Sequence, residues 1–341
     1  GNRDIDFLGK AITVRGTDPA DPDVVAGTVI DCQGTDQDGH RAFHLHSGEG
    51  LDSVISGLTM RNGYQHDGGA VRCWGAGIRV NKCRFLDNTS VAQGGAIFAH
   101  TSSVEVRESY IEENAAGGDG GGLHAYKGSF VAEETTFESN SAAGHGGGIH
   151  IEEATAQILN NRIRNNYTQH FGGGIRGRDG CDVQIKNNSL TGNYSEWGGG
   201  GVNVWNGNAT ILHNTFADNV AGRNGGAAAA HGSTLNIEEN TIESNSAMAH
   251  GGAIILHSTE AVILRNEIRF NQSQRMGGAI RCWDESDVEI SDNIVGGNSA
   301  GWSGGAISIR VGSASLLRND IAANDASRHA GGIHLDGATA R

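Results

Sequence analysis

The chain has 341 residues, including 54 glycines and only 2 prolines, and its formal net charge is −14. At 37% hydrophobic residues it is too apolar for a disordered chain, and its glycines do not recur every third residue as in collagen. The acidic charge argues against nucleic-acid phosphates or an anionic membrane surface as the main partner. No stretch reaches the roughly 18 apolar residues of a membrane span, so we expect no membrane insertion of this segment.

The first part of the chain, residues 1–61, predicts irregular first coils of a repeat structure. Three short strands are expected there, at Lys10–Arg15, Thr28–Cys32 and Phe43–His46. Phe43 and Leu45 keep the inward alternation of a strand although no Gly-Gly pair precedes them.

Residues 62–341 consist of regular coils of about 26 residues. A Gly-Gly-(Gly/Ala)-apolar signature recurs every 26 or 27 residues, and we call its apolar residue the marker. The markers are Val71, Ile97, Leu123, Ile149, Ile175, Val202, Ala228, Ile254, Ile280, Ile307 and Ile333. Each repeat holds three short apolar runs of period two: one after the Gly-Gly pair, one of Val-x-Ile type, and one before an asparagine.

No such run can bury its inward face alone, whereas stacked coils pair every strand in parallel with its equivalents above and below. The sequence therefore predicts an all-β, right-handed, single-stranded parallel β-helix with three short strands per coil. The chain stops in mid-repeat at Arg341, and we expect no cap at this end. An uncapped end is an open sheet edge that can pair with another copy, which predicts self-association or filaments.

Two columns of asparagine keep the phase of the repeat. One lies nine residues before each marker, and the other five residues earlier still, where Cys83, Ser109 and Thr135 precede the asparagines. The first column is Asn62, Asn88, Asn114, Asn140, Asn166, Asn193, Asn219, Asn245, Asn271, Asn298 and Asn324; the second is Asn161, Asn188, Asn214, Asn240, Asn266, Asn293 and Asn319. We interpret both as ladders of stacked amides that satisfy turn backbone. Five scattered cysteines form neither a disulfide framework nor a metal knuckle, and their odd number leaves at least one unpaired.

The motifs Gly94–Ile97, Gly277–Ile280 and Phe137–Asn140 resemble the GGA[ILV] and FxxN repeats of chlamydial polymorphic outer-membrane proteins and of bacterial secreted β-helix surface proteins. This resemblance implies a cell-surface or extracellular location and a role in adhesion. Related β-helices also include pectate lyases, polygalacturonases, alginate lyases and epimerases, so the resemblance leaves carbohydrate chemistry open.

The residues one and three positions after each marker are expected to face outward. The +3 column is Trp74, His100, Tyr126, Glu152, Arg178, Trp205, His231, His257, Trp283, Arg310 and Asp336; the +1 column is Arg72, Phe98, His124, His150, Arg176, Asn203, Ala229, Ile255, Arg281, Ser308 and His334. The loop before each Gly-Gly pair adds His66, Asp67, His145, His170, Trp197, His250, Trp302 and His329. Aromatic and guanidinium planes along a rod suit an extended glycan or another partner; the alternative is an ordinary solvent-facing β surface.

Metal binding is a weaker prediction. His124, His145 and His150, near His100, Asp119 and Glu152, are candidate ligands because His124 and His150 share a column one coil apart. Calcium is considered for the acidic turns 179–182 and 284–287, where solvated charge is the simpler interpretation. No other cofactor is expected.

Catalysis is not our first prediction, because the +3 column carries only two acids, seven coils apart, and no regular repeat has a cleft-forming insertion. The sequence predicts an extracellular structural or adhesive solenoid with a contact stripe. A polysaccharide lyase, hydrolase or epimerase on the same stripe is the alternative.

Overall fold

The structure is a computed structural model that describes residues 2–340. The chain divides into two compact units, Gly1–Gln169 (unit 1) and His170–Arg341 (unit 2). In each unit, parallel strands stack coil upon coil in three sheets, and the only helix among the described residues is α1 (Pro22–Gly27). The predicted parallel β-solenoid is therefore confirmed. No helix of the described chain is long and apolar enough to cross a membrane.

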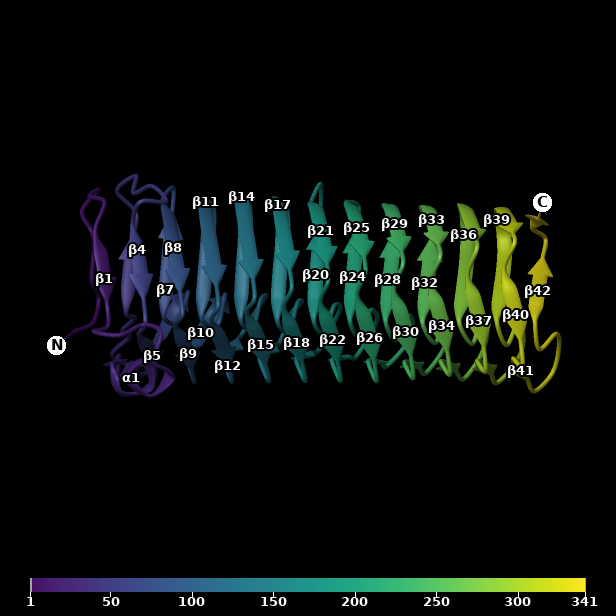
Figure 1. Ribbon diagram of the computed structural model, residues 1–341, viewed down its shortest axis with the longest axis horizontal. Coiled ribbons are helices and arrows are strands. Elements are labelled where there is room, and N and C mark those ends of the chain that lie inside the picture. The colour runs from purple at the N-terminus through teal and green to yellow at the C-terminus, as the bar shows by residue number, and fades with distance from the viewer. Residues whose placement is uncertain (1, 341) are drawn as a thin grey trace. The chain divides into compact units, whose positions relative to one another are not determined.

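Unit 1 has its strands side by side in chain order, as β11, β14 and β17 show in Figure 1. Its first sheet contains β1 (Thr13–Arg15), β3 (Phe43–Leu45), β4 (Val54–Ser56), β7 (Val71–Trp74), β8 (Gly77–Asn81), β11 (Ile97–Arg107), β14 (Leu123–Glu133) and β17 (Ile149–Leu159). Its second contains β2 (Val29–Asp31), β5 (Thr59–Arg61), β9 (Arg84–Leu86), β12 (Tyr110–Glu112), β15 (Thr136–Glu138) and β18 (Arg162–Arg164). Its third contains β6 (Tyr64–Asp67), β10 (Thr89–Gln93), β13 (Ala115–Ala116), β16 (Ser141–Ala142) and β19 (Tyr167–Thr168).

Unit 2 repeats the same plan. Its first sheet contains β20 (Ile175–Arg178), β21 (Asp182–Lys186), β24 (Val202–Trp205), β25 (Asn208–Leu212), β28 (Ala228–His231), β29 (Thr234–Glu238), β32 (Ile254–His257), β33 (Glu260–Leu264), β36 (Ile280–Ser291), β39 (Ile307–Leu317), β42 (Ile333–Asp336) and β43 (Thr339–Ala340). Its second contains β22 (Ser189–Thr191), β26 (Thr215–Ala217), β30 (Thr241–Glu243), β34 (Glu267–Arg269), β37 (Ile294–Gly296) and β40 (Asp320–Ala322). Its third contains β23 (Tyr194–Ser195), β27 (Val220–Ala221), β31 (Ser246–Ala247), β35 (Gln272–Ser273), β38 (Ser299–Ala300) and β41 (Asp325–Ala326).

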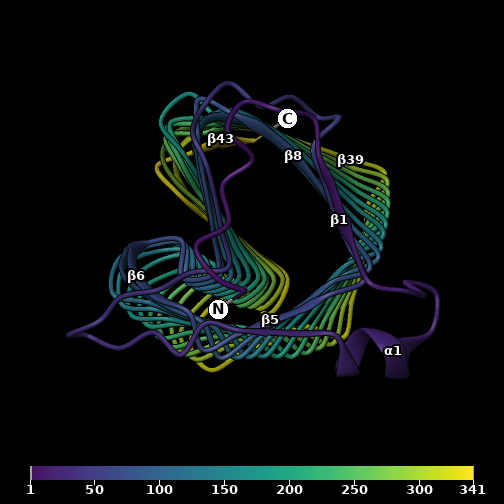
Figure 2. The same ribbon diagram turned by 90° about the vertical axis from the view of Figure 1, so that its left-hand side faces the viewer.

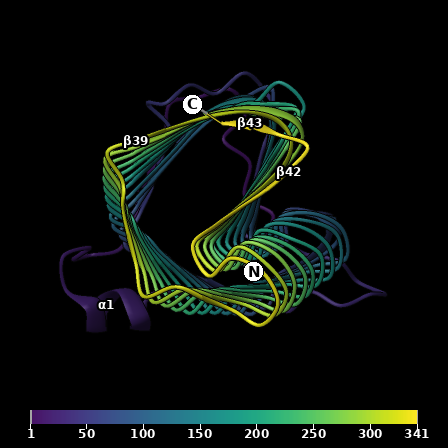
Figure 3. The ribbon, with the colours of Figure 1, turned by 90° about the vertical axis from the view of Figure 1, so that its right-hand side faces the viewer.

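The three predicted runs map onto two of these sheets. The first two runs share the first sheet and in β11, β14 and β17 form one continuous strand, while the run before the asparagine makes the second sheet. The third sheet comes from short strands just after the asparagine, which were not predicted. These strands lead into a lobe, the segment between the third sheet and the Gly-Gly pair, and Figure 3 shows this lobe bulging from the coils of unit 2 beside β42.

The first coils contain strands β1, β2 and β3 where three strands were expected, together with β4, β5 and a helix that were not expected there. Helix α1 lies outside the coils, beside β5 (Figure 2), and the Thr59 hydroxyl donates a hydrogen bond of 2.8 Å to the carbonyl of Val25. The carboxylate of Asp21 accepts from the backbone N–H of Asp23, which caps the helix start. The boundary predicted near residue 61 stays a prediction.

The asparagine ladders form as predicted. In unit 1 the amide of Asn114 donates 2.9 Å to Asn140 Oδ1, and in unit 2 the amide of Asn245 donates 2.9 Å to Asn271 Oδ1. In the second column, Asn214 donates 3.0 Å to Asn240. These side chains are buried, and each amide also reaches a backbone carbonyl, which satisfies the turns.

Asn62 is a correction to the first ladder. It is exposed, with φ +54°, and its amide donates to the Asp31 carboxylate at 3.0 Å. Asn88 Oδ1 instead accepts a hydrogen bond from the backbone N–H of Gly63. The reason is that the strand register here steps by 25 residues, from Thr59 to Arg84. The first ladder therefore starts one coil later than predicted.

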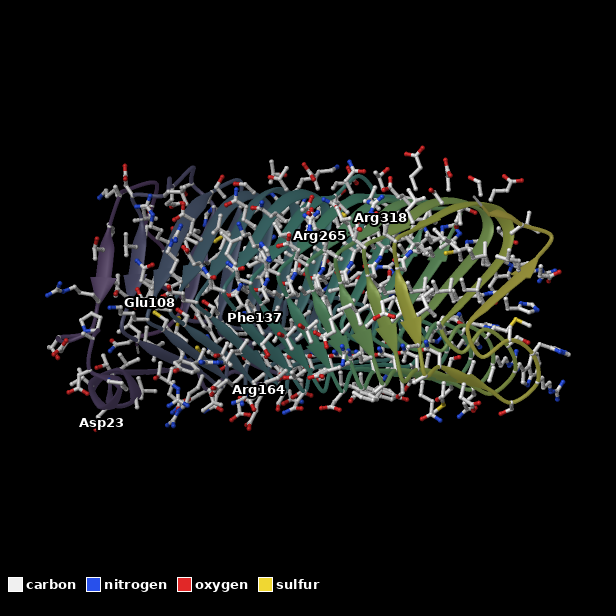
Figure 4. All side chains as sticks on the ribbon, turned by 45° about the vertical axis from the view of Figure 1, so that its right-hand side comes forward. Asp23, Glu108, Phe137, Arg164, Arg265 and Arg318 are labelled. Atoms are coloured by element: carbon white, nitrogen blue, oxygen red, sulfur yellow. The ribbon has the colours of Figure 1, made fainter. Side chains whose placement is uncertain are left out.

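The interior of each coil is apolar. Phe137, labelled in Figure 4, is fully buried, as are the markers Leu123 and Ile149. All five cysteines are buried and free, so the expectation of no disulfide framework is confirmed. Burial raises the pKa of the Cys73 and Cys282 thiols to about 12, which keeps both in the unreactive thiol form.

Candidate functional site

The +1 column corrects the sequence prediction that it faces solvent. Its side chains do point out of the coil, but Phe98, His124 and His150 are at most 4% exposed. The reason is the lobe, whose Gly-Gly pair closes over them: a Cβ added at Gly146 would lie 2.9 Å from the Cβ of His150. The +1 column is therefore a second buried layer between strand and lobe.

The +3 column lies at the edge of this layer and forms a ring stack in unit 1. Trp74 is 43% exposed and stacks on His100 with ring centroids 3.8 Å apart and planes 8° apart, and Tyr126 follows at 5.1 Å. The guanidinium of Arg72 lies 4.7 Å from the centre of the Trp74 ring. Burial is the main cause that lowers the pKa of His100, and the positive charge of Lys127 is the second. This ring is therefore neutral near pH 7.

The +3 column of unit 2 holds a longer stack. Trp205 and His231 are 4.0 Å apart with planes 10° apart, and His231 and His257 are 4.4 Å apart. Trp283 comes next, 6.1 Å from His257 and turned by 89°, and Arg310 lies 5.9 Å from the centre of its ring. Burial, followed by the neighbouring His257, lowers the pKa of His231.

A groove of about 270 Å³ runs along this stack in unit 2. One wall is the ring stack of the +3 column, the other is the lobe, and the floor comes from small or aliphatic +1 residues. The lining residues are Phe171, Trp197, Gly198, Asn203, Trp205, Arg223, Asn224, Ala229, Ala230, His231, Ile255, His257 and Trp283. None of these described residues is acidic.

Two buried arginines of the +1 column flank the floor. Arg176 and Arg281 are 3% and 1% exposed, and their guanidinium groups donate to Asn203 Oδ1 and to Ser308 Oγ. Arg176 also lies 5.7 Å from the ring centre of Trp205, and Arg281 lies 5.7 Å from that of Trp283. Burial lowers the pKa of Arg281, but a guanidinium keeps its charge at neutral pH.

Two members of the predicted stripe do not join either stack. Glu152 lies against the buried histidines of unit 1, and Arg178 pairs with Asp179 at 2.6 Å. The stripe is thus brought together as two separate runs, Trp74–Tyr126 in unit 1 and Trp205–Arg310 in unit 2, rather than along the whole +3 column.

The candidate metal ligands of unit 1 converge in part. His124 and His150 face each other across β14 and β17, and together with Glu152 they place three ligand atoms within 4.8 Å of one another. His145 is outside this set: its ring centre lies 6.1 Å from that of His150. Asp119 is bound to the lobe, since its carboxylate accepts from the backbone N–H of His145 at 2.7 Å.

The acidic turns considered for calcium do not gather ligands. Asp179 pairs with Arg178, and the carboxylate of Asp284 lies 2.9 Å from Nε2 of His257. Neither turn supplies three converging ligand atoms among the residues that the structure describes. A hollow of about 490 Å³ beside α1 in unit 1 is lined by uncharged and charged residues, and two of its charged pairs are Lys82 with Glu108 at 3.4 Å and Arg84 with Glu112 at 3.2 Å.

The comparisons with known proteins address the fold. The family model described as "Right handed beta helix region" matches residues 25–167 and 147–326. No curated protein matches the chain. Among solved structures, the A-module of the mannuronan C-5 epimerase AlgE4 of Azotobacter vinelandii is similar, with TM-score 0.56 and 14% identity over 92% of this chain and 88% of that one. The A-module of AlgE6 from the same organism gives a TM-score of 0.40 at 11% identity, with the same coverage.

The family model defines the class: a parallel solenoid whose coils wind in the right-handed sense. Because the family model covers most of the sequence, the chain belongs to the right-handed β-helix family. The resemblance to the chlamydial repeats in particular stays a prediction.

The groove was only partly visible in the sequence. The +3 stack and Trp197 were among the predicted outward residues, but Phe171, Arg223 and Asn224 of the lobe were not. A signal was present in the +1 column, where the side chains shrink from Phe98, His124 and His150 to Asn203 and Ala229.

Proposed function

We propose that this protein is a non-catalytic extracellular binding module, and that unit 2 holds a stretch of acidic polysaccharide in its groove. The observation that carries the proposal is the groove itself. Its walls are aromatic, and none of its described lining residues is acidic. In the +1 column, a buried arginine lies at each end of the groove floor.

The walls suit a sugar chain. The stacked rings of Trp205, His231 and His257 form one wall of the groove. Trp197, 41% exposed on the lobe, adds apolar surface opposite. Such a mixture of apolar surface and a few polar groups is typical of sites that bury a ligand and fix its orientation.

The charge favours an anionic polymer over a neutral one. Arg223 lines the groove, and Arg176 and Arg281 flank its floor, although the whole chain carries a formal charge of −14. Guanidinium groups match carboxylates in bidentate geometry, which suits the carboxylates of uronic acids. The AlgE4 module is named as an enzyme acting on mannuronan, a polyuronate; at 14% identity this supports only its inclusion among the ligands tested.

The test is binding of polymannuronate, polygalacturonate and a neutral β-glucan to the full chain, measured by affinity electrophoresis and calorimetry. We expect Trp205→Ala to weaken polyuronate binding about 10-fold, since aromatic contacts are worth about 1 kcal/mol beyond their buried area. Trp74→Ala is the matched control, because Trp74 also stacks on a histidine but belongs to unit 1 and does not line the groove. Equal loss in both variants, or no preference for polyuronates, would contradict the proposal.

A second candidate function is a polysaccharide lyase or epimerase in the same groove. His231 favours it: a ring with a lowered pKa is a neutral base near pH 7, and neighbouring guanidinium groups can stabilise a carboxylate while a proton leaves the adjacent carbon. The binding samples are therefore also assayed for new chain ends, unsaturated products and changed uronate composition. Products that disappear in His231→Gln would establish this function in place of simple binding.

A further inference from the structure

The cluster of His124, His150 and Glu152 belongs to unit 1, and none of these three residues lines the groove of unit 2. His124 and His150 occupy directly opposed positions of β14 and β17, and Glu152 follows His150 by two residues on the same strand. The geometry is fixed by the ladder, because the two strands are paired in register from the pair Leu123–Ile149 to the pair Tyr126–Glu152, the stretch that carries all three side chains. Three side chains therefore reach one point without help from a loop.

The distances fit a small cation. Glu152 Oε2 lies 3.9 Å from His124 Nε2 and 3.7 Å from His150 Nε2, and the ring centres are 4.6 Å apart. Ligands around a tetrahedral Zn²⁺ at about 2.0–2.2 Å are about 3.3–3.5 Å from one another. Binding requires side-chain rotations that shorten the two distances to the carboxylate by about half an ångström and draw together the three ligand atoms, which lie within 4.8 Å of one another.

The ligand types select the metal. Two imidazoles and one carboxylate suit first-row transition cations, whereas Ca²⁺ and Mg²⁺ prefer sites made of oxygen alone. The side chains of the histidines are at most 1% exposed, while that of Glu152 is 19% exposed, so solvent reaches the cluster from the carboxylate side. Three protein ligands with one solvent-facing position is the arrangement of zinc sites that keep a water.

We propose that unit 1 binds one divalent first-row transition metal ion, such as Zn²⁺, through His124, His150 and Glu152, with water completing the coordination. The alternative is that Glu152 only balances charge on the histidines. The two differ in stoichiometry and in the effect of removing the carboxylate.

The experiment is calorimetric titration of the chelator-treated full chain with ZnCl₂, repeated with Co²⁺ so that visible absorption reports the coordination. We expect one ion per chain. Glu152→Gln, nearly isosteric at a half-buried position, should weaken binding at least about 100-fold, since even outer-sphere partners of metal sites are worth 10–100-fold.

Asp284→Asn is the matched control. His231, His257 and Asp284 of unit 2 also combine two stacked imidazoles with a carboxylate, at 4.4 Å and 2.9 Å, but their ligand atoms do not converge. This variant should bind Zn²⁺ as the wild type does. His150→Gln removes one proposed ligand, and circular dichroism checks that this variant folds. If it does not fold, Glu152→Gln alone tests the metal site. The proposal is overturned if the folded wild type binds no ion, if Glu152→Gln binds as tightly as the wild type, or if Asp284→Asn weakens binding equally.

Discussion

Units 1 and 2 have the same backbone repeat and differ in the side chains that lie between strand and lobe. In unit 1 this layer is filled by Phe98, His124 and His150, all at most 4% exposed. In unit 2 the corresponding stretch holds Asn203 and Ala229, and a groove of about 270 Å³ opens above them. A solenoid thus makes a closed surface or a binding groove by changing side-chain size in one column, with the hydrogen-bonded frame left intact.

The largest expected effect tests the frame that both units share. Gly146 has φ +64°, and an added Cβ would come 2.5 Å from the carbonyl oxygen of Ile149. Gly146→Ala should therefore lower the free energy of unfolding by about 3 kcal/mol, from left-handed strain plus a backbone clash. Gly251→Ala, with φ +62° and a 2.3 Å approach to Ile254 in unit 2, should cost a similar amount. Urea unfolding measures both.

Gly75→Ala is the control for that comparison. Gly75 has φ +60°, yet no atom lies within 4 Å of the added Cβ, so only the backbone strain of about 1 kcal/mol remains. If Gly146→Ala cost no more than Gly75→Ala, the lobe would not be held tightly against the +1 column.

The sequence predicts the frame well and the lobe poorly. The period of 26 residues, the asparagine columns and the inward alternation identify the solenoid, because stacking requires equivalent residues in every coil. Alternation also places the +1 column outside the coil correctly, but it cannot show that another segment covers it. The strands that lead into the lobe, such as Ser141–Ala142, are only two residues long and carry no periodicity. Helix α1 had a readable start signal, Asp21 followed by Pro22.

The next effect concerns pH and the partly buried His250 on the lobe of unit 2. Burial, followed by Arg281 and Arg275, lowers the pKa of His250 to about 4. The unfolded chain then binds a proton more readily than the folded one between about pH 6.5 and 4. Stability is therefore complete above pH 6.5 and is lost as the pH falls toward 4.

We expect this loss to be about 2 kcal/mol, discounted for the partial exposure of the ring. His250→Gln should flatten the pH dependence of unfolding followed by tryptophan fluorescence, since four of the five tryptophans, all except Trp74, belong to unit 2. His66→Gln, which replaces an exposed histidine of β6 in unit 1, is the control for the substitution itself.

The smallest expected effect comes from placing a histidine of the unit 1 type in the +1 column of unit 2. Ala229 forms part of the groove floor at the position where unit 1 has His124 or His150. Ala229→His should fill the groove and weaken polyuronate binding about 10-fold, equivalent to about 1.4 kcal/mol, while thermal unfolding changes little because the added ring has room in the groove. Ala217→His, on the second sheet of unit 2, should leave binding unchanged. Undiminished binding by a folded Ala229→His would mean that ligands contact only the outer edge of the ring stack, and the size of the +1 residues would then not explain the difference between the two units.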